Sequence, residues 1–405
     1  MVRQRRSAAG TRRILRGAAA GLMLRMLLSG LLLLATGCTA TATSLSPRGD
    51  AAAAYLHATG APGVVIGWSA GDGHPQIATA GTASLATGVP VDRRTIFHMA
   101  SVTKPLVAAA ILQLAEQGRL DLDASPTRYL PYFRLADPRF AQVTIRQMLN
   151  HTSGLPDVED YEWEHPQTSD AALERWVRGL AGLKLVSDPG AAVHYSNLAY
   201  DVLGDVIAKA SGMPFESYVR RHLLAPLGMR HSSLLLAEVD RSHLAAPHMP
   251  EGGQVRVSAV FPYNRVHAGS STLYADATDM LRWARYWAAR PGRAKARLLS
   301  DAGIAAMLKP SAAVDRPDRA QWRPAIGLGW FLLRVEGRAI AFHMGQDVGF
   351  TTGMMVEPGT GRAVVAMSNI ATEAAGERMF DLCLTMMTAM QAPPPATRSG
   401  SYSGR

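Results

Sequence analysis

Segments with the short apolar or alternating pattern of β-strands lie at the two ends of this chain, and helical patterns lie between them. Near the start, residues 64–70 and 76–80 flank Gly71-Asp72-Gly73, which predicts a hairpin. Near the end, four more strands are expected at residues 326–335, 339–343, 353–357 and 363–367. Because strands must pair to satisfy their backbone groups, the simplest fold joins the two ends in one antiparallel sheet.

The apolar residues of the remaining segments recur every three or four positions, as in amphipathic helices. Helices are expected at residues 101–117, 145–150, 171–180, 198–210, 215–224, 276–289 and 373–390. We therefore predict an α+β fold of two lobes, with an antiparallel sheet flanked by helices and a mainly helical lobe. Within a domain at 48–391, residues 48–120 and 321–391 form the first lobe and residues 121–320 form the second. A cleft between two lobes is a usual place for a site.

Composition and charge exclude several classes of protein. Apolar residues make up 48% of the 405 residues and charged residues 18%, which suits a large buried core and excludes a disordered chain. The formal net charge is +10, but seven arginines and no acid fall within residues 1–37, which leaves +3 for the rest. A nucleic-acid binder keeps its basic surface on the folded domain, so we expect no nucleic-acid partner.

The N-terminal segment has the pattern of an export signal. An Arg-rich start precedes an apolar run at residues 17–37, and small residues stand directly before Cys38, which resembles a bacterial lipoprotein box. We expect residues 1–37 to be a signal peptide and Cys38 to be lipidated, which would anchor the protein to a membrane of the cell envelope. A plain signal peptide and an uncleaved anchor remain open. Residues 38–47 are predicted to be a tether, and residues 392–405 a disordered tail.

Ser101 and Lys104 lie one turn apart at the start of the helix expected at 101–117. Residues three apart share a helix face, with about 5–6 Å between their Cβ atoms. A Ser hydroxyl needs a base to remove its proton, and a Lys whose charge is disfavoured by burial can be that base. Free N–H groups at a helix start also favour a developing oxyanion. The alternative is an N-cap Ser followed by a surface Lys.

Two further groups of residues suit the same chemistry. Tyr195 can shuttle a proton and Asn197 can hydrogen-bond a substrate carbonyl. The alternative is that Ser196 or Asn197 only caps the following helix. His343 and Gly345 end a predicted strand, where a Gly lets a ligand approach the backbone closely. The alternative there is a buried structural His.

Other polar residues indicate structural roles. His151 lies at an expected helix end and turn, and His98 is expected to pack before the Ser101 helix. Cys38 and Cys383 are the only cysteines, so neither a zinc-type cluster nor, with Cys38 lipidated, an internal disulfide is expected. The chain has no His-Glu-x-x-His, phosphate-binding loop, dinucleotide fingerprint or Gly-x-Ser-x-Gly elbow. We predict no metal and no organic cofactor.

The order Ser-x-x-Lys, Tyr-x-Asn and His-x-Gly resembles the class C β-lactamase and penicillin-binding-protein superfamily of serine hydrolases, which includes esterases and D-aminopeptidases. The segments that support this resemblance are Phe97–Leu122, Leu149–Leu155, Tyr195–Met229 and Gly345–Asn369. The resemblance implies a β-lactamase/D,D-peptidase-like fold. It also implies a two-step reaction through a covalent acyl-enzyme on a small ester, amide or peptide-like substrate.

The resemblance implies a role for each of the first four site residues. Ser101 would be the acylated nucleophile, and Lys104 would activate it. Tyr195 would assist proton transfer to the leaving group and activate the water that removes the acyl group. Asn197 would position the substrate carbonyl.

The third motif departs from the Lys-Thr-Gly of true β-lactamases. The resemblance places His343 on the strand that lines the site, and it places the N–H groups of Ser101 and of Gln346, just after Gly345, in the oxyanion hole. A neutral His and an apolar Met344 hold a substrate carboxylate less well than Lys and Thr. We therefore expect an exported, esterase-like serine hydrolase. The alternatives are a β-lactamase or penicillin-binding D,D-carboxypeptidase, and a catalytically silent binding module on the same fold.

Overall fold

The computed structural model describes residues 50–71, 73–290, 292, 296–315 and 322–390. The apolar run, Cys38, the tether and the C-terminal tail lie outside the described residues, and the predictions made for them stay predictions. Within the described part of the chain, no helix has the length and apolar character needed to cross a membrane.

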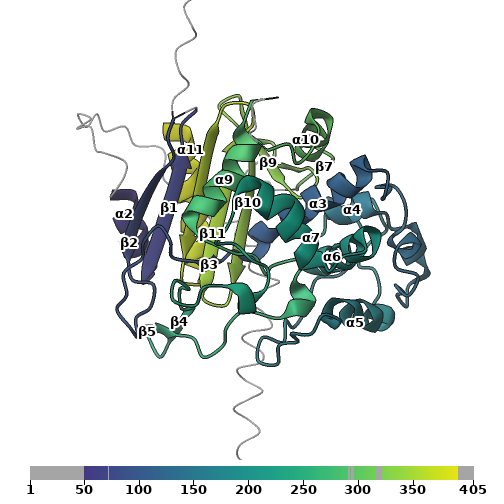
Figure 1. The fold of residues 1–405 in the computed structure, drawn as a ribbon, viewed down its shortest axis with the longest axis horizontal. Helices are drawn as coiled ribbons and strands as arrows, with labels where there is room; N and C mark the ends of the chain where they lie inside the picture. The colour runs from purple at the N-terminus through teal and green to yellow at the C-terminus, as the bar shows by residue number, and fades with distance from the viewer. Residues whose placement is uncertain (1–49, 72, 291, 293–295, 316–321, 391–405) are drawn as a thin grey trace, which may run out of the picture.

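One eight-stranded antiparallel sheet forms the first lobe (Figure 1). Its order is β2-β1-β12-β11-β10-β9-β8-β7. The strands are β1 Gly63–Ser69, β2 Gln76–Gly81, β7 Ala312–Ala313, β8 Ala325–Ile326, β9 Phe331–Val335, β10 Arg338–Asp347, β11 Phe350–Glu357 and β12 Arg362–Ser368. The two chain ends meet where β1 pairs with β12, with Val64 opposite Ser368. The predicted joining of the ends in one sheet is therefore confirmed.

Two strands near the third motif differ from the sequence prediction. The strand expected at 326–335 is broken into β8 and β9 by a turn in which Gly329 has a φ of +77°. β10 continues past its expected end at His343 to Asp347, because that last residue still pairs with Phe350 of β11. The third motif thus lies inside a strand rather than at its end.

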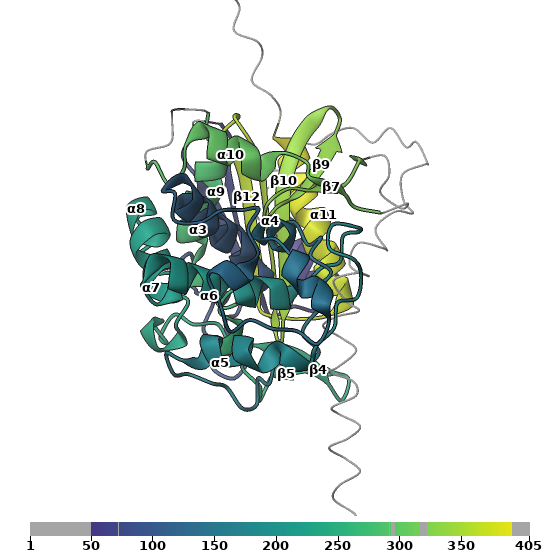
Figure 2. The same cartoon turned by 90° about the vertical axis from the view of Figure 1, so that its right-hand side faces the viewer.

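Different helices cover the two faces of the sheet (Figure 2). The helices are α2 Asp50–Thr59, α9 Ala277–Ala288 and α11 Glu373–Ala389. α2 and α11 pack on one face, and α9 packs on the other. Alternate residues of β12 divide between the two sides, since Val364 and Ala366 join the core beneath α11 while Val365 and Met367 join the core beneath α9. The sheet is therefore buried on both faces.

Short helices form the second lobe, beside the sheet in Figure 1. They are α3 Lys104–Glu116, α4 Ile145–Leu149, α5 Ala172–Arg178, α6 Asn197–Ser211, α7 Phe215–Val219, α8 Ala225–Leu227 and α10 Asp301–Leu308. α3 packs against α6, α7 and α10, although its residues fall in the range that we predicted for the first lobe. α9 falls in the range that we predicted for this lobe, yet it lies on the sheet because its buried side chains, Met280 and Trp287 among them, join the core of the sheet.

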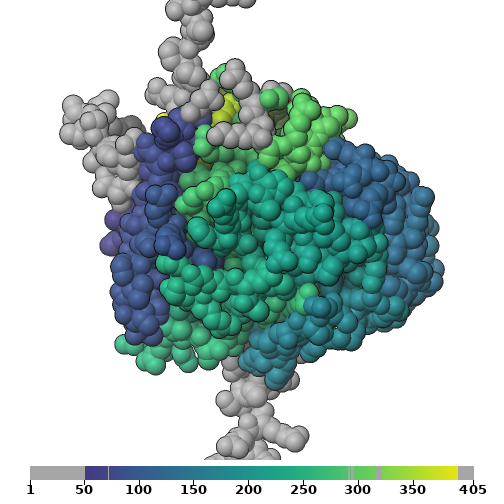
Figure 3. All heavy atoms as spheres, in the orientation of Figure 1, coloured from purple at the N-terminus to yellow at the C-terminus, as the bar shows by residue number. Residues whose placement is uncertain are grey.

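Several elements were not expected from the sequence. They include α2, α8, α10, β7 and two small antiparallel pairs, β3 Phe97–His98 with β6 Tyr274–Ala275 and β4 His248–Glu251 with β5 Gln254–Val257. The β3–β6 pair ties the residues just before Ser101 to the segment that leads into α9. In the space-filling view, the N-terminal strands lie along one side of this face and the helical lobe forms the opposite side (Figure 3).

Candidate active site

Ser101 lies in a short 3-10 helix, Ala100–Thr103, that leads directly into α3. The residue before it, Ala100, has a φ of +47°, which residues other than Gly rarely adopt. The Thr103 hydroxyl donates to the Ala100 carbonyl (2.7 Å) and accepts the N–H of Leu273 (3.1 Å). Neighbouring residues thus hold the strained segment in place, and strain of this kind tends to occur at functional sites.

The Lys104 side chain is fully enclosed, and its ammonium has three acceptors. Nζ lies 2.9 Å from Ser101 Oγ, 2.6 Å from Asn197 Oδ1 and 2.9 Å from the carbonyl oxygen of Ser270. Burial lowers the pKa of Lys104 from 10.5 to about 7, against three nearby carboxylates that raise it. A sizeable fraction of Lys104 is therefore neutral near pH 7, and the alternative of a surface Lys is wrong.

Tyr195 brings a phenol to the same place. Its hydroxyl is buried and interacts with the Ser101 hydroxyl, although it forms no hydrogen bond of ordinary geometry among the described residues. Lys104 Nζ lies 5.0 Å from the centroid of the Tyr195 ring. Burial raises the pKa of Tyr195 well above 10, so the phenol carries its proton at neutral pH. It is therefore able to donate a proton to a nearby leaving group.

His151 lies closer to the site than the sequence indicated. Its ring stacks on Tyr195 with 4.3 Å between centroids, and its Nδ1 accepts the backbone N–H of Ser196 (3.1 Å). Burial, with the neighbouring charge of Lys104, holds the pKa of His151 well below 6.5, so the ring is neutral. Ser196 in turn caps α6 by accepting the N–H of Ala199 (3.0 Å). The capping alternative thus holds for Ser196.

Asn197, the first residue of α6, lies between the Lys104 ammonium and a carboxylate. Its Oδ1 accepts from Lys104, and its Nδ2 donates to Asp157 Oδ1 at 2.9 Å. The side chain is buried, and these two contacts fix the orientation of its amide. Asp157 was not among the predicted site residues, although it lies only two residues after the Leu149–Leu155 segment.

The third motif runs along the edge of β10 beside the nucleophile. The pairing of β10 with β9 stops before His343, and this part of β10 packs against the 3-10 helix that holds Ser101. A Cβ on Gly345 would lie 2.5 Å from the Met99 carbonyl oxygen and 3.0 Å from Ser101 N. Only Gly fits here, and the close approach that we predicted is made by the nucleophile's own backbone.

The side chains of His343 and Gln346 are both hydrogen-bonded to neighbouring protein groups. His343 is buried, and its Nδ1 donates to the Met344 carbonyl (2.8 Å). Burial lowers the pKa of His343 to about 3, so the ring is neutral at any working pH. Gln346 Nε2 donates to Thr351 Oγ1 (2.8 Å) and to the Thr372 carbonyl (2.9 Å), which directs its side chain into the sheet. Neither side chain offers charge to a substrate carboxylate.

The ring of Phe331 lies beside the rings of Tyr195, His151 and His343, and we call these four side chains the aromatic wall. Phe331 was not predicted to belong to the site. Its half-buried ring lies 6.3 Å from Tyr195, 6.5 Å from His151 and 5.5 Å from His343, measured between ring centroids. Phe331 begins the strand after the Gly329 turn, a position that no motif marks. The wall gives this side of the site an apolar, uncharged surface.

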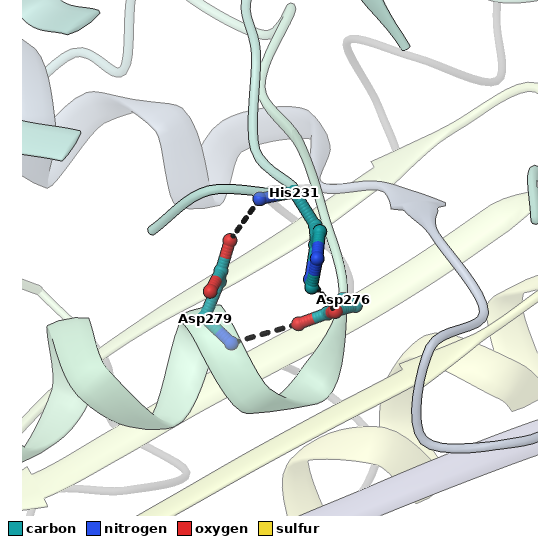
Figure 4. A group of neighbouring side chains, drawn as sticks. All are labelled: His231, Asp276 and Asp279. Carbon is teal, nitrogen blue, oxygen red and sulfur yellow. Dashed lines mark hydrogen bonds and ion pairs between the residues drawn. The ribbon is translucent and has the colours of Figure 1, made fainter. Parts of the chain in front are cut away.

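Three potential metal ligands gather outside the site, with His231, Asp276 and Asp279 offering atoms within 4.8 Å of one another (Figure 4). Their atoms are already engaged by protein groups. Asp276 caps α9 by accepting the N–H of Asp279 (2.8 Å), and its other oxygen lies 2.8 Å from His231 Nδ1. Asp279 accepts the N–H of His231 (2.7 Å) and binds Arg282. The cluster fits a helix cap better than a metal site.

The sheet, the helical lobe and the site at their junction together define a class of protein. Ser101, Lys104 and Tyr195 converge beside β10, the strand that carries the third motif. This is the arrangement of serine hydrolases built on the β-lactamase/penicillin-binding-protein fold.

Comparison with known proteins establishes the family. A family model described as "Beta-lactamase" matches residues 49–382, so the chain belongs to the β-lactamase family and is a serine hydrolase. It is 33% identical over 315 residues to "Esterase EstB" of Burkholderia gladioli, covering 64% of this chain and 80% of the relative. It is 27% identical over 343 residues to "Penicillin-binding protein 4" of Amycolatopsis lactamdurans, covering 81% and 87%.

Other matches are partial or concern the fold alone. The chain spans 54% of the length of "Protein flp" of Staphylococcus aureus (strain MW2), at 26% identity over 281 residues. The structure of D-amino acid amidase from Ochrobactrum anthropi SV3 aligns with a TM-score of 0.66 and 24% identity, covering 84% of this chain and 98% of the amidase. The predicted family and fold class are confirmed, whereas the roles of individual residues stay predictions.

Proposed function

We propose that this protein is an esterase-like hydrolase that cleaves neutral ester or amide bonds through an acyl-enzyme on Ser101. The main observation in support is that Nζ of the buried Lys104, whose pKa is lowered to about 7, lies 2.9 Å from Ser101 Oγ. The preference for uncharged substrates rests on the neutral His343 in the third motif and on the aromatic wall. The resemblance to a relative named as an esterase supports the same preference.

In the proposed acylation, neutral Lys104 accepts the proton of Ser101 Oγ as the oxygen attacks the substrate carbonyl carbon. The backbone N–H groups of Ser101 and Gln346 stabilise the resulting oxyanion, each typically worth about 2.7–4 kcal/mol. When the bond to the leaving group breaks, Tyr195 donates its proton to that group and regains one from the Lys104 ammonium. The net transfer is one proton from Ser101 to the leaving group.

Deacylation repeats these steps with water as the nucleophile. Tyr195 and Lys104 together accept a proton from the water as its oxygen attacks the acyl carbonyl. Collapse of the second tetrahedral intermediate releases the acid and returns the proton to Ser101 Oγ. Asn197 holds Lys104 in place, because its Oδ1 accepts from the ammonium at 2.6 Å, and its Nδ2 is the group able to donate to the substrate carbonyl.

The second candidate is a β-lactamase or penicillin-binding D,D-carboxypeptidase. The similarity to a relative named as a penicillin-binding protein favours it. The neutral third motif counts against it, because those enzymes bind the carboxylate of their substrates. A catalytically silent module is disfavoured, since such proteins usually lose the nucleophile or the base, and both are present and in contact here.

Intact mass spectrometry after exposure to a fluorophosphonate or to benzylpenicillin separates these candidates. We expect a fluorophosphonate adduct, mapped to Ser101 by peptide analysis, and little or no penicillin adduct. Adducts with both reagents would instead favour the second candidate, an enzyme that reacts with penicillins. Labelling by neither would contradict catalysis and favour a binding module.

We further propose that the protein is exported and anchored by a lipid on Cys38. The Arg-rich start, the apolar run at 17–37 and the small residues before Cys38 support this proposal. A Cys38→Ser variant is expected to lose incorporation of a labelled fatty acid in bacterial cells. Label that persists in the variant would show that Cys38 is not the lipidated residue.

A further inference from the structure

The carboxylate of Asp157 is hydrogen-bonded to Asn197 and pairs with no cation among the described residues. Its Oδ1 accepts three N–H groups, from the Asn197 backbone (2.8 Å), from Asn197 Nδ2 (2.9 Å) and from the Val158 backbone (2.9 Å). These donors are neutral, so they do not cancel the charge of the carboxylate, and they partly offset the burial that raises the pKa of Asp157. The Asn197 backbone donor is the first N–H of α6, where the helix dipole favours a negative group.

This contact decides which way the Asn197 amide points. A carboxylate only accepts hydrogen bonds and an ammonium only donates them. With Nδ2 bound to Asp157, the amide oxygen must face Lys104, as observed at 2.6 Å. If Asp157 were absent, the amide could turn its NH2 group toward the neutral amine of Lys104, which can accept a hydrogen bond, and the contact that aligns Lys104 with Ser101 would be lost.

We propose that Asp157 is a positioning residue that orients Lys104 through Asn197 and adds a negative charge to the surroundings of the ammonium. This inference rests on the proposed function, in which Lys104 is the base for Ser101. Asp157 touches neither Ser101 nor Lys104 through any hydrogen bond described, so it acts through Asn197 and through its field.

Other charged groups also face Lys104, and they differ from Asp157 in their partners. Asp201 lies 2.8 Å from His267 Nδ1, and Asp347 lies 2.8 Å from His98 Nε2, so each has an imidazole beside it. Among the carboxylates that raise the pKa of Lys104 against the larger effect of burial, Asp157 contributes most. The imidazoles of His151 and His343 on the other side are neutral, because burial lowers both of their pKa values.

The charge of Asp157 determines the direction in which its removal shifts the pKa of Lys104. A carboxylate favours the protonated form of a neighbouring Lys, so removing the charge lowers the pKa of Lys104. The rate of Ser101 acylation, which needs neutral Lys104, then begins to rise at a lower pH. A purely structural role for Asp157 predicts lower stability or lower activity without this displacement along the pH axis.

Two variants separate the effect of the Asp157 charge from its effect on the orientation of the Asn197 amide. Asp157→Asn keeps a carbonyl acceptor for the Asn197 amide and removes the charge, whereas Asp157→Ala removes both. Asp205→Asn is the matched control, since Asp205 is a buried carboxylate of α6 that accepts from Tyr132 (2.7 Å) and is not among the charges that shift the pKa of Lys104. Should Asp157→Asn not fold, Asp157→Ser keeps a short acceptor without charge.

The first measurement is the rate of fluorophosphonate labelling between pH 4.5 and 9. We expect the acid limb of Asp157→Asn to lie at least about 0.5 pH unit below that of wild type, as loss of a nearby opposite charge predicts. Asp157→Ala should show the same displacement and, in addition, a plateau rate about ten-fold lower, because general-base catalysis needs the base within hydrogen-bond reach. Asp205→Asn should coincide with wild type.

The second measurement needs no activity. The chain contains only five Lys, so ε-carbon NMR of lysine-labelled protein can follow Lys104 directly, with Lys104→Met to assign its signal. An unchanged titration midpoint of Lys104 in Asp157→Asn would overturn the inference, as would equal plateau rates for Asp157→Asn and Asp157→Ala. Absence of labelling in wild type would instead reject the proposed function, and the titration would still decide the electrostatic effect.

Discussion

A Lys104→Met variant is expected to acylate Ser101 about 100- to 10,000-fold more slowly than wild type, the usual range for loss of a general base. Methionine has nearly the length of lysine, so at this enclosed position the change removes the proton acceptor without leaving a large cavity. The rate of fluorophosphonate labelling and kcat/KM for a short-chain nitrophenyl ester measure the loss.

A Lys on the same fold provides the control. Lys209 lies at the surface, where it pairs with Glu174, and Lys209→Met is expected to keep wild-type rates. Ser101→Ala should lose activity as severely as Lys104→Met, and the double variant should lose little more, because the two residues act as a unit. Additive losses, or a Lys104→Met enzyme near wild-type rate, would show that Ser101 is activated by another group.

The second large effect is expected from a single methyl group at Gly345. A Cβ there would lie 2.5 Å from the Met99 carbonyl oxygen, 2.6 Å from Thr352 Oγ1 and 3.0 Å from Ser101 N, so β10 and the nucleophile segment must move apart. Thr352 Oγ1 also donates to the Met99 carbonyl (2.9 Å), which ties this segment to β11. Gly345→Ala should therefore displace the Ser101 N–H.

We expect Gly345→Ala to lower kcat about 100- to 1,000-fold, as does loss of one oxyanion donor, and to cost about 1–3 kcal/mol in the free energy of unfolding. Esterase kinetics and urea denaturation measure the two effects. Gly179→Ala is the control, because Gly179 has a φ of −73° and a Cβ there meets nothing within 4 Å. If Gly345→Ala kept wild-type kcat, the proposed place of the oxyanion hole would be wrong.

Much of the fold could be predicted because its signals are local. A Gly-rich signal between two apolar runs predicted the hairpin, and β1 and β2 do pair. Helical periodicity located α6 and α11 to within a few residues. α9 was placed in the wrong lobe, since periodicity shows that a helix has an apolar face but not which surface covers it. The break at Gly329 was missed for a similar reason, because a single Gly does not by itself end a strand.

Some residues of the candidate site could likewise be predicted from the sequence, and others could not. Ser101, Lys104, Tyr195 and Asn197 were found from side chains that suit one reaction, and the structure brings them together. Ser270 was missed because it contributes only its backbone carbonyl, which every residue possesses.

His151, Asp157 and Phe331 were missed as parts of the site because their importance comes from what they contact. His151 stacks on Tyr195, Asp157 fixes the Asn197 amide, and Phe331 lines the aromatic wall. None of these contacts follows from residue type or from spacing along the chain.

By itself, the sequence determined which chemical groups are present: a Ser and a Lys at i and i+3, a phenol, and a third motif whose His brings no fixed charge. Only the tertiary structure decided how those groups behave. Lys104 becomes a base near pH 7 because residues from α6, the Ser270 turn and β10 enclose it and remove it from water. The cost of burying a charge depends on all the atoms around it, and a chain brings those atoms together only when it folds.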